Sequence, residues 1–203
     1  MESTAKKVRP RGSSTDKRRA ILKAALEIYC KKGYEHTTMT DIAQMAGVAI
    51  GTLYKHYPDK KKMFLDMYEL YFFEIAALPF EKLKNLAKPF EMRKMFESIV
   101  DSIVQGHKYA PKHIHDAMMA LVHYDEDFKR KDNECKLKLT DMVITMLDKN
   151  GFSDPYYREK LHFFINVVEL YSHEVVYHET EGLEYANIKE SLIFFSNCFL
   201  YGL

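Results

Sequence analysis

The chain has 203 residues, 47% of them hydrophobic and 29% charged, so it is long enough for one large domain or for a small and a medium one. No apolar run approaches the roughly 18 residues of a membrane span, and the polar, basic N-terminus lacks the apolar core of a signal peptide. Its cysteines, Cys30, Cys135 and Cys198, form no C-x-x-C pair, so we expect a soluble cytoplasmic protein with reduced thiols, a redox switch being the alternative.

The charge is unevenly spread along the chain. Residues 1–62 carry 14 Lys and Arg against 6 Asp and Glu, and the remainder carries 16 against 23. A basic N-terminal third on an acidic body predicts a polyanionic partner at one end only. Residues 1–15 are basic, contain Pro, Gly and Ser, and lack apolar periodicity, which predicts a disordered arm. Such an arm either contacts DNA, along the phosphates or in the minor groove, or only keeps the protein soluble.

The first predicted helix covers residues 16–32 and ends before Gly33. A second helix begins after Thr38, because Asp41 follows it three residues later in the capping pattern S/T-x-x-D/E. One buried face is predicted from the helical spacing of Met39, Ile42, Ala43 and Ala46. Gly47 then stops the helix, since a glycine enters the left-handed conformation without steric cost.

A third, short helix is predicted over residues 50–57, with Pro58 after its end. Two short helices around an Ala-Gly-Val turn make a helix-turn-helix, whose second helix normally enters the DNA major groove. An ordinary helical corner is the alternative. Asp59 caps a further helix that opens with Lys60, Lys61 and Lys62, three cations at the positive end of the helix dipole, which favours a phosphate backbone nearby.

The predicted DNA contacts are hydroxyl, cationic, aromatic and backbone groups in and beside this motif. They are Thr37, Thr38, Ala49, Ile50, Gly51, Thr52, Tyr54, Lys55, His56, Tyr57, Lys60 and Lys61.

The run TTMTDIAQMAGVAIGTLYKHYPDK, from Thr37 to Lys60, resembles the DNA-binding signature of the TetR family of bacterial transcriptional regulators. The resemblance covers residues 16–64 and is specific, because spacing and residue type agree at many positions. It implies an all-α homodimer with an N-terminal three-helix helix-turn-helix DNA-binding domain and a C-terminal helical domain that binds a small effector and dimerises. The predicted division is a disordered basic arm (1–15), a DNA-binding domain (16–62) and an effector-binding and dimerisation domain (63–203).

Two positions depart from the family pattern. Ala49 stands where a serine commonly caps the recognition helix, which costs on the order of 1 kcal/mol. Ile50 is apolar where the family often presents a polar side chain to the bases, so it can contact a thymine methyl group but cannot form a hydrogen bond.

The rest of the chain is predicted to be helical throughout, without strand alternation or internal repeats. The helix from Lys60 is expected to run to Leu78, which would make it a lever between the two domains. The later helices are predicted over residues 89–105 (stopped by Gly106), 112–125 (followed by an acidic turn), 133–149, 154–179, and from 184–187 to the C-terminus.

The last two predicted helices carry more apolar residues than a single core-facing stripe needs. This surplus predicts a helix-bundle dimer interface, and the family resemblance also implies dimerisation there. A fully buried central helix is the alternative.

An enzyme is not expected. The sequence has no G-x-S-x-G, Walker A or G-x-G-x-x-G motif, and the Glu169–His173 and Glu174–His178 pairs match no known metal motif, so no catalytic residue, metal or cofactor is predicted. A more specific hypothesis is that a buried histidine, for example His123 or His173, forms a hydrogen bond with an effector. Most of the histidines are expected to be ordinary surface or core residues.

Eleven methionines and 27 Phe and Tyr residues favour an adaptable apolar cavity for an organic or lipophilic effector. The predicted effector-binding residues, each of which also fits an ordinary core position, are Phe96, Met118, His123, Met142, Met146, Phe164 and His173.

The predicted mechanism is repression at a palindromic operator by the unliganded dimer, with release when the effector rotates the helix that starts at Lys60. Reversed polarity, in which the effector favours DNA binding or the protein activates, stays open. The alternative from another class is a helical ligand-binding or scaffolding protein with weak, non-specific DNA binding, suggested by Ala49 and Ile50.

Overall fold

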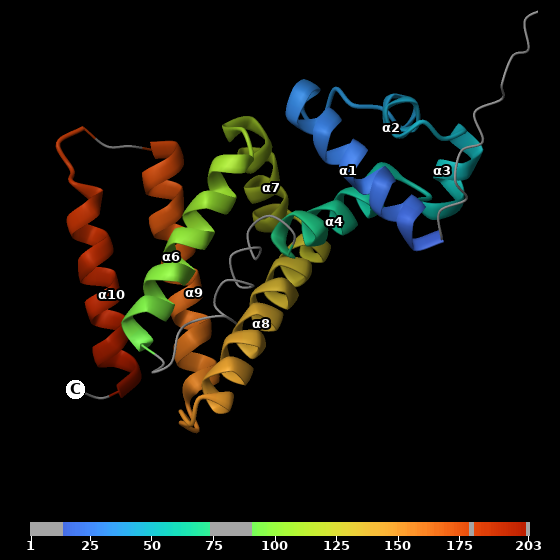
Figure 1. Ribbon diagram of the computed structural model, residues 1–203. Helices are drawn as coiled ribbons and strands as arrows, with labels where there is room; N and C mark the ends of the chain where they lie inside the picture. Colours follow the sequence, from blue (N-terminus) through green and yellow to red (C-terminus); the bar gives the residue numbers. More distant parts are fainter. Residues whose placement is uncertain (1–13, 74–90, 179–180, 202–203) are drawn as a thin grey trace, which may run out of the picture. The chain divides into compact units, whose positions relative to one another are not determined.

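The computed structural model describes residues 14–73, 91–178 and 181–201, and this part of the chain is helical with no strand. It divides into two compact units, Met1–Met67 and Tyr68–Leu203. Figure 1 shows an all-α protein in which the N-terminal unit combines the long α1 with the short α2 and α3. The fold class predicted from the sequence, an N-terminal helix-turn-helix domain followed by a helical domain, is therefore confirmed.

The N-terminal unit contains α1 (Ser14–Lys32), α2 (Met39–Ala46), α3 (Ile50–His56) and the start of α4 (Lys60–Tyr71). Its core consists of large side chains that are almost completely buried, chiefly Ile21, Tyr29, Ile42, Leu53, Tyr57 and Phe64. Each helix contributes at least one of them, and the short α3 is anchored by Leu53. Burial of such side chains stabilises helices that would be marginal alone.

The predicted boundaries in this unit agree with the structure to within two residues. Helix α1 begins at Ser14 rather than residue 16, and α3 ends at His56, so Tyr57 is its C-cap. Asp59 caps α4 by accepting a hydrogen bond from the Lys62 amide at 2.7 Å. The structure follows α4 to Tyr71 and a wider turn at residues 72–73, and the rest of the predicted helix to Leu78 lies outside the described residues.

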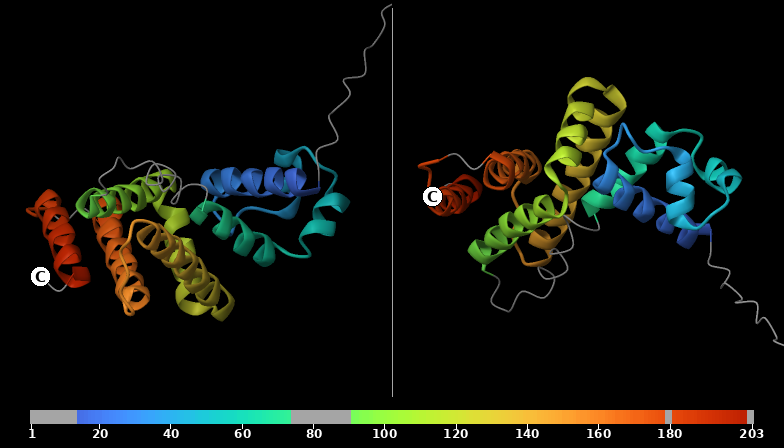
Figure 2. Two further views of the ribbon diagram at one scale, coloured as in Figure 1. Left: turned by 60° about the horizontal axis from the view of Figure 1, so that its bottom comes forward. Right: turned by 90° about the horizontal axis from the view of Figure 1, so that it is seen from above.

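The C-terminal unit contains α6 (Met92–Tyr109), α7 (Lys112–Tyr124), α8 (Glu126–Lys149), α9 (Tyr157–His173), the π-helix η2 (Glu174–His178) and α10 (Tyr185–Tyr201). Helix α9 packs against α6, α8 and α10, and α7 packs against α8. Both views in Figure 2 place α10 at the edge of this unit beside α9 and α6. The aromatic pair Phe96 and Phe164 joins α6 to α9 in the core, with ring centroids 5.0 Å apart.

Three helix ends in this unit differ from the predictions. Gly106 does not stop α6, because it is buried inside the helix, where its carbonyl accepts a hydrogen bond from the Tyr71 hydroxyl at 2.8 Å. Helix α8 begins at Glu126 and not at residue 133, since the Asp125 side chain accepts the amides of Asp127 and Phe128 and turns the predicted acidic turn into a helix cap. The α-helical part of α9 ends at His173, and the following residues form the wider η2.

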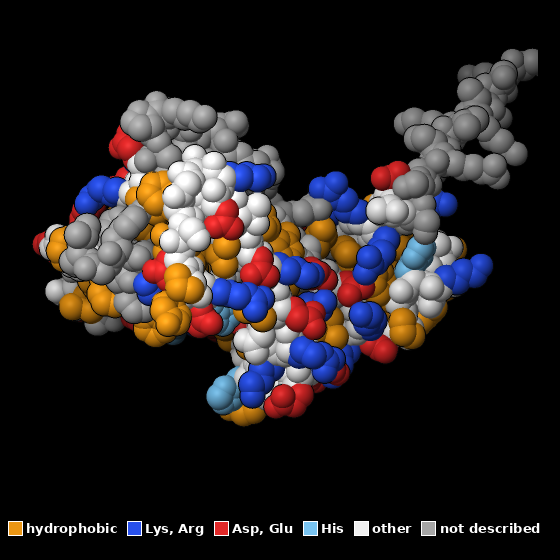
Figure 3. Space-filling model, turned by 90° about the horizontal axis from the view of Figure 1, so that it is seen from below, with side chains coloured by type: hydrophobic (Ala, Val, Ile, Leu, Met, Phe, Trp, Pro, Cys, Tyr) orange, Lys and Arg blue, Asp and Glu red, His pale blue; other side chains and the backbone are white. Residues whose placement is uncertain are grey.

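Large apolar side chains remain exposed on α9 and α10. Leu170 is 63% exposed and Phe194 is 67% exposed, and Phe163 and Phe195 are about half exposed. In the face drawn in Figure 3, hydrophobic side chains reach the surface on the side where α10 lies. Among the described helices, none is both long enough and apolar enough to cross a bilayer.

Candidate DNA interface and effector-binding site

The start of α2 is fixed by a reciprocal capping box. The Asp41 amide donates to Thr38 Oγ1 at 3.1 Å, and the Thr38 amide donates to Asp41 Oδ2 at 2.9 Å. Hydrogen bonds from the Lys32 ammonium and from Thr38 hold the pKa of Asp41 below its usual value. Gly47 ends the helix at φ 64°, a left-handed conformation in which its amide faces the carbonyls of Ala43 and Gln44.

Helix α3 begins without a side-chain cap. Ala49 occupies the N-cap position, so only its backbone carbonyl helps, by accepting the amides of Thr52 and Leu53 at 2.8 and 3.1 Å. The short helix is held in place from its opposite side, where Leu53 and Tyr57 are fully buried. This anchoring fixes which side chains of α3 face solvent.

The outward face of α3 carries a mixed apolar, aromatic and basic surface. Ile50 is 41% exposed, Tyr54 is 51% exposed, and Lys55 is exposed beside them. A side chain added at Gly51 would meet no atom within 4 Å, so the backbone there is open to an approaching molecule. Thr52 and His56 are half-buried at the edges of this face.

Other predicted DNA contacts are engaged inside the unit. Thr37 is buried and donates from Oγ1 to the Gly33 carbonyl at 2.7 Å. Tyr57 is buried and its hydroxyl accepts a hydrogen bond from Arg18 at 3.0 Å. The Lys60 ammonium donates to the Tyr34 and Thr37 carbonyls at 2.9 and 3.3 Å, and it lies 4.3 Å from the centre of the Tyr34 ring.

The cations at the start of α4 therefore have neighbours within the free protein. Lys60 is held as described, and Lys62 lies 3.3 Å from the Asp66 carboxylate. Lys61 is half-buried. Lys60 and Lys62 therefore need no external phosphate as a partner in the free protein.

Arg18 is a residue of this unit that the sequence analysis did not single out. Its guanidinium contacts both Tyr57 and the buried carboxylate of Asp66, so it ties α1 to the end of α3 and to α4. The only signal in the sequence is the basic run Lys17-Arg18-Arg19 near the start of α1, which resembles an ordinary solvated face.

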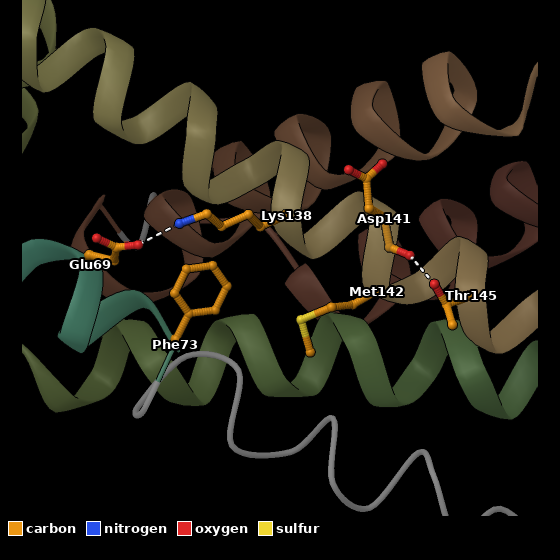
Figure 4. A pocket seen from close by; sticks show the side chains of 6 residues that line it. All are labelled: Glu69, Phe73, Lys138, Asp141, Met142 and Thr145. Carbon is orange, nitrogen blue, oxygen red and sulfur yellow. Dashed lines mark hydrogen bonds and ion pairs between the residues drawn. The ribbon is translucent and has the colours of Figure 1, made fainter.

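The predicted effector-binding residues do not gather in one cavity of the described structure. Phe96, Phe164 and Met118 are buried core residues, and Met146 is half-buried. Met142 is 42% exposed and lines a shallow hollow with Glu69, Phe73 and Lys138. Figure 4 shows the Lys138 ammonium turned toward Glu69, and the two atoms in contact are 2.5 Å apart.

A second hollow, of about 600 Å³, runs along α7 beside the start of α8 and the end of α9. The exposed His123 and the half-buried His173 line it together with His115, Asp116 and His178. Of the predicted effector residues, it therefore brings together only the two histidines.

This hollow borders a cluster of three imidazoles that the sequence analysis did not predict. His107 on α6, His115 on α7 and His173 on α9 each offer a ring nitrogen within 4.8 Å of the others. The ring centroids of His115 and His173 are 4.4 Å apart, and those of His107 and His173 are 4.9 Å apart. The Glu169 carboxylate lies 3.5 Å from His107 Nε2 and 3.7 Å from His173 Nε2.

The three histidines of this cluster differ in pKa, because burial and the neighbouring charges act on them differently. Burial and the charges of the neighbouring histidines lower the pKa of His115 to about 4, and the same two effects lower the pKa of His173 to about 4. Burial also opposes a charge on His107, but the Glu169 carboxylate and the Ile103 carbonyl offset it and raise the pKa of His107. The pKa of Glu169 lies below its usual value despite burial, because His107 stabilises the carboxylate. At neutral pH the cluster therefore contains two neutral imidazoles and an ionised carboxylate.

The N-terminal unit is similar in sequence to known bacterial regulatory proteins. Residues 21–67 match the family model described as bacterial regulatory proteins, tetR family. The repressor KstR of Mycolicibacterium smegmatis is 47% identical over 45 residues, 22% of this chain and 22% of that protein. The regulator AcrR of Shigella flexneri is 36% identical over 64 residues, 32% of this chain and 30% of that protein. The alignments thus span less than a third of these relatives.

Solved structures resemble almost the whole chain in fold. FadR of Thermus thermophilus, a repressor crystallised with lauroyl-CoA, has 24% identity and a TM-score of 0.64, covering 92% of this chain and 94% of its own. FadR of Bacillus subtilis, crystallised with stearoyl-CoA, has 15% identity and a TM-score of 0.58, covering 91% and 98%. The sequence match assigns the helix-turn-helix region, residues 21–67, to the TetR family of bacterial regulatory proteins, and the solved structures show that the whole chain shares their fold.

Proposed function

We propose that this protein is a DNA-binding transcriptional regulator, a homodimeric repressor that a small organic effector releases from a palindromic operator. The observation that carries the proposal is the outward face of α3, where Ile50, Gly51, Tyr54 and Lys55 project from a helix whose opposite side is fully buried. A short, anchored helix with an exposed basic and aromatic face suits insertion into the major groove. The relatives compared above are named as regulators, and we propose no enzymatic activity.

Each group on this face has a role that follows from its chemistry. Lys55 supplies a cation for a phosphate, and the Tyr54 hydroxyl can bond a phosphate or a base edge. Gly51 lets a DNA backbone or base approach closely, and Ile50 packs on a thymine methyl group. Thr37, Tyr57 and Lys60 are proposed to act by fixing the position of α3 and the α2 start, because their polar groups already have partners within the unit.

The dimer is proposed to form through α9 and α10. Leu170 and Phe194 are more than 60% exposed on these helices, and such side chains are usually buried in an interface when they cluster. A two-fold axis would present two α3 helices to half-sites about 34 Å apart, or a multiple of it. Because a two-fold axis would relate the two α3 helices, the operator would be an inverted repeat.

The effector is proposed to bind the C-terminal unit and to favour a conformation that cannot bind DNA. Acyl-CoA thioesters are the first compounds to test, because two proteins of the same fold were crystallised with them. A few kcal/mol of differential affinity between the two conformations is sufficient for release. Helix α4 contributes residues to both units, so it is the proposed route of the coupling.

The deciding experiment is selection of bound duplexes from a random DNA pool with the purified protein at near-physiological salt. An enriched inverted repeat is expected, and acyl-CoA is expected to weaken binding to that repeat. Recovery of no motif, with weak binding that disappears as salt rises, would contradict the regulator and favour the helical scaffolding protein.

Variants of α3 connect the selected site to its residues. Tyr54→Ala is expected to weaken specific binding about fivefold to 150-fold, the effect of losing about 1–3 kcal/mol of base or phosphate contact. Lys55→Ala is expected to lower the salt slope by about one per bound protomer. Lys149→Ala, which removes an exposed cation at the end of α8, is the matched control and is expected to leave both quantities unchanged.

A further inference from the structure

We propose that His107, His115 and His173, together with Glu169, form a binding site for a divalent transition-metal ion of the zinc class. The proposal concerns the C-terminal unit alone and does not depend on DNA binding. Three imidazole nitrogens and one carboxylate oxygen make a donor set that Zn²⁺ prefers.

Three helices bring the ligands to one end of the unit. His107 lies in the last turn of α6, His115 in the first turn of α7, and His173 at the end of α9, one turn after Glu169. Figure 1 shows the C-terminal ends of α6 and α9 at the same end of the unit. Tyr177 in η2 fixes this arrangement, because its hydroxyl donates to the His107 and Ala110 carbonyls at 2.5 and 3.0 Å and its ring stacks on His115.

Buried nitrogen atoms without partners are the strongest observation. Within the described residues, neither the ring nitrogens of His115 nor Nε2 of His173 have a hydrogen-bond partner, since the nearest carboxylates, Asp116 and Glu169, lie 3.6 and 3.7 Å away. Leaving such groups buried is unfavourable, and buried polar groups normally bind a protein group, a water or an ion. A metal ion would use the lone pairs that the protein leaves unpaired.

His107 is oriented as metal-bound histidines usually are. Its Nδ1 lies 2.8 Å from the Ile103 carbonyl, to which it can donate, and this leaves Nε2 directed toward Glu169 and the other rings. A backbone carbonyl that holds the second ring nitrogen fixes the tautomer and the ring orientation of a ligand. His107→Ala would remove this ligand.

The local charge suits a divalent cation. The Glu169 carboxylate lies 3.5 Å from His107 Nε2 and 3.7 Å from His173 Nε2, so it places an acidic oxygen donor beside the imidazoles. Lys136 is the neighbouring cation that opposes metal binding, but its ammonium is paired with Asp132 at 3.0 Å.

A small closure would complete the coordination. Tetrahedral zinc with bonds of about 2.0–2.1 Å places its ligand atoms about 3.4 Å apart, whereas the three nitrogens here lie within 4.8 Å of one another. Rotation of the imidazoles supplies the difference. The hollow lined by His115 and His173 gives the ion a route from solvent.

The test is titration of untagged, chelator-treated protein with Co²⁺ and then with Zn²⁺. We expect one saturable site per chain, with the visible absorption of tetrahedral Co²⁺ bound by nitrogen and oxygen, and displacement of Co²⁺ by Zn²⁺. His115→Gln and His173→Gln are each expected to weaken binding at least tenfold. His113→Gln, an exposed histidine on the same helix as His115, is the matched control and is expected to bind normally.

Two results would overturn the proposal. One is equal metal binding by the wild type and the folded His115→Gln and His173→Gln variants, with folding checked by circular dichroism. The other is a strong thiolate-to-cobalt band in the wild type, which would assign the metal to cysteine. The second result needs no variant, so the proposal stays testable if removal of a buried imidazole unfolds the protein.

Discussion

The α2–α3 segment and the histidine cluster are built in opposite ways. In α2–α3, the Thr38 cap finds its partner in Asp41 three residues away, and Ile50 and Tyr54 of α3 face outward. In the cluster, side chains from α6, α7 and α9 meet inside the unit, and several of their nitrogens have no partner among the described residues. The first construction depends on local chemistry and presents a fixed surface. The second depends on how three helices pack, so small changes in packing or a bound ion alter it.

The largest expected effect tests whether long-range packing holds the C-terminal unit. Phe96 is fully buried and its ring meets Phe164 of another helix, so Phe96→Ala should lower the free energy of unfolding by about 3–5 kcal/mol. Urea denaturation measures the change. Tyr124→Ala, which truncates an aromatic residue that is 85% exposed, should change it by less than about 0.5 kcal/mol. Similar losses in both variants would show that the packing of Phe96 against Phe164 does not dominate the stability of this unit.

A smaller effect is expected from a hydrogen bond between distant parts of the chain. The buried Tyr68 hydroxyl donates to Asp132 at 2.6 Å, so Tyr68→Phe should cost about 1.5–3 kcal/mol, the range for a bond to a charged group. Tyr29 provides the contrast, because its buried hydroxyl has no partner among the described residues. Tyr29→Phe should be neutral or stabilising, and a loss of stability there would show that the hydroxyl is satisfied in solution.

The cap of α2 should contribute less, because it is a single local hydrogen-bond pair. Thr38→Ala is expected to cost about 1 kcal/mol, measured by thermal unfolding. The lowered pKa of Asp41 adds stability that is present above its unfolded pKa of about 3.9 and is lost as pH falls toward the folded value. Thr38→Ala should therefore also flatten the acid limb of the stability curve, and an unchanged acid limb would mean that Lys32 and the backbone amide of residue 38 suffice to lower the pKa.

The smallest effect is a gain at the missing cap of α3. Ala49 has the extended backbone of an N-cap, φ −67° and ψ 143°, but no side-chain acceptor. Ala49→Ser should stabilise the protein by up to about 1 kcal/mol, because its hydroxyl can accept an amide in the first turn of α3. Differential scanning calorimetry measures the gain, with Ala49→Val, of larger side chain and no acceptor, as the control expected to show none.

The sequence predicted the N-terminal unit closely because its signals are short-range. The pair Thr38 and Asp41, the glycine at position 47 and the aspartate at position 59 each act on residues within four positions, and the structure places all of them as helix caps or stops. The internal contacts of Tyr57 and Lys60 were not predicted, because their partners Arg18 and Tyr34 lie in other parts of the unit.

In the C-terminal unit, predictions from local sequence patterns were wrong where tertiary contacts opposed them. Gly106 has the residue type of a helix stop, yet it lies inside α6 under the Tyr71 hydroxyl. The predicted effector residues are individually apolar or aromatic, but periodicity does not distinguish a core side chain such as Phe164 from one lining a hollow such as Met142.

By itself the sequence determined the helical class and the helix-turn-helix, since caps, glycines and apolar spacing act within a turn or two of the chain. Only the tertiary structure decided which polar groups are engaged internally and which histidines meet. His107, His115 and His173 share no spacing that a single helix could use, and the packing of α6, α7 and α9 alone brings their nitrogens within 4.8 Å.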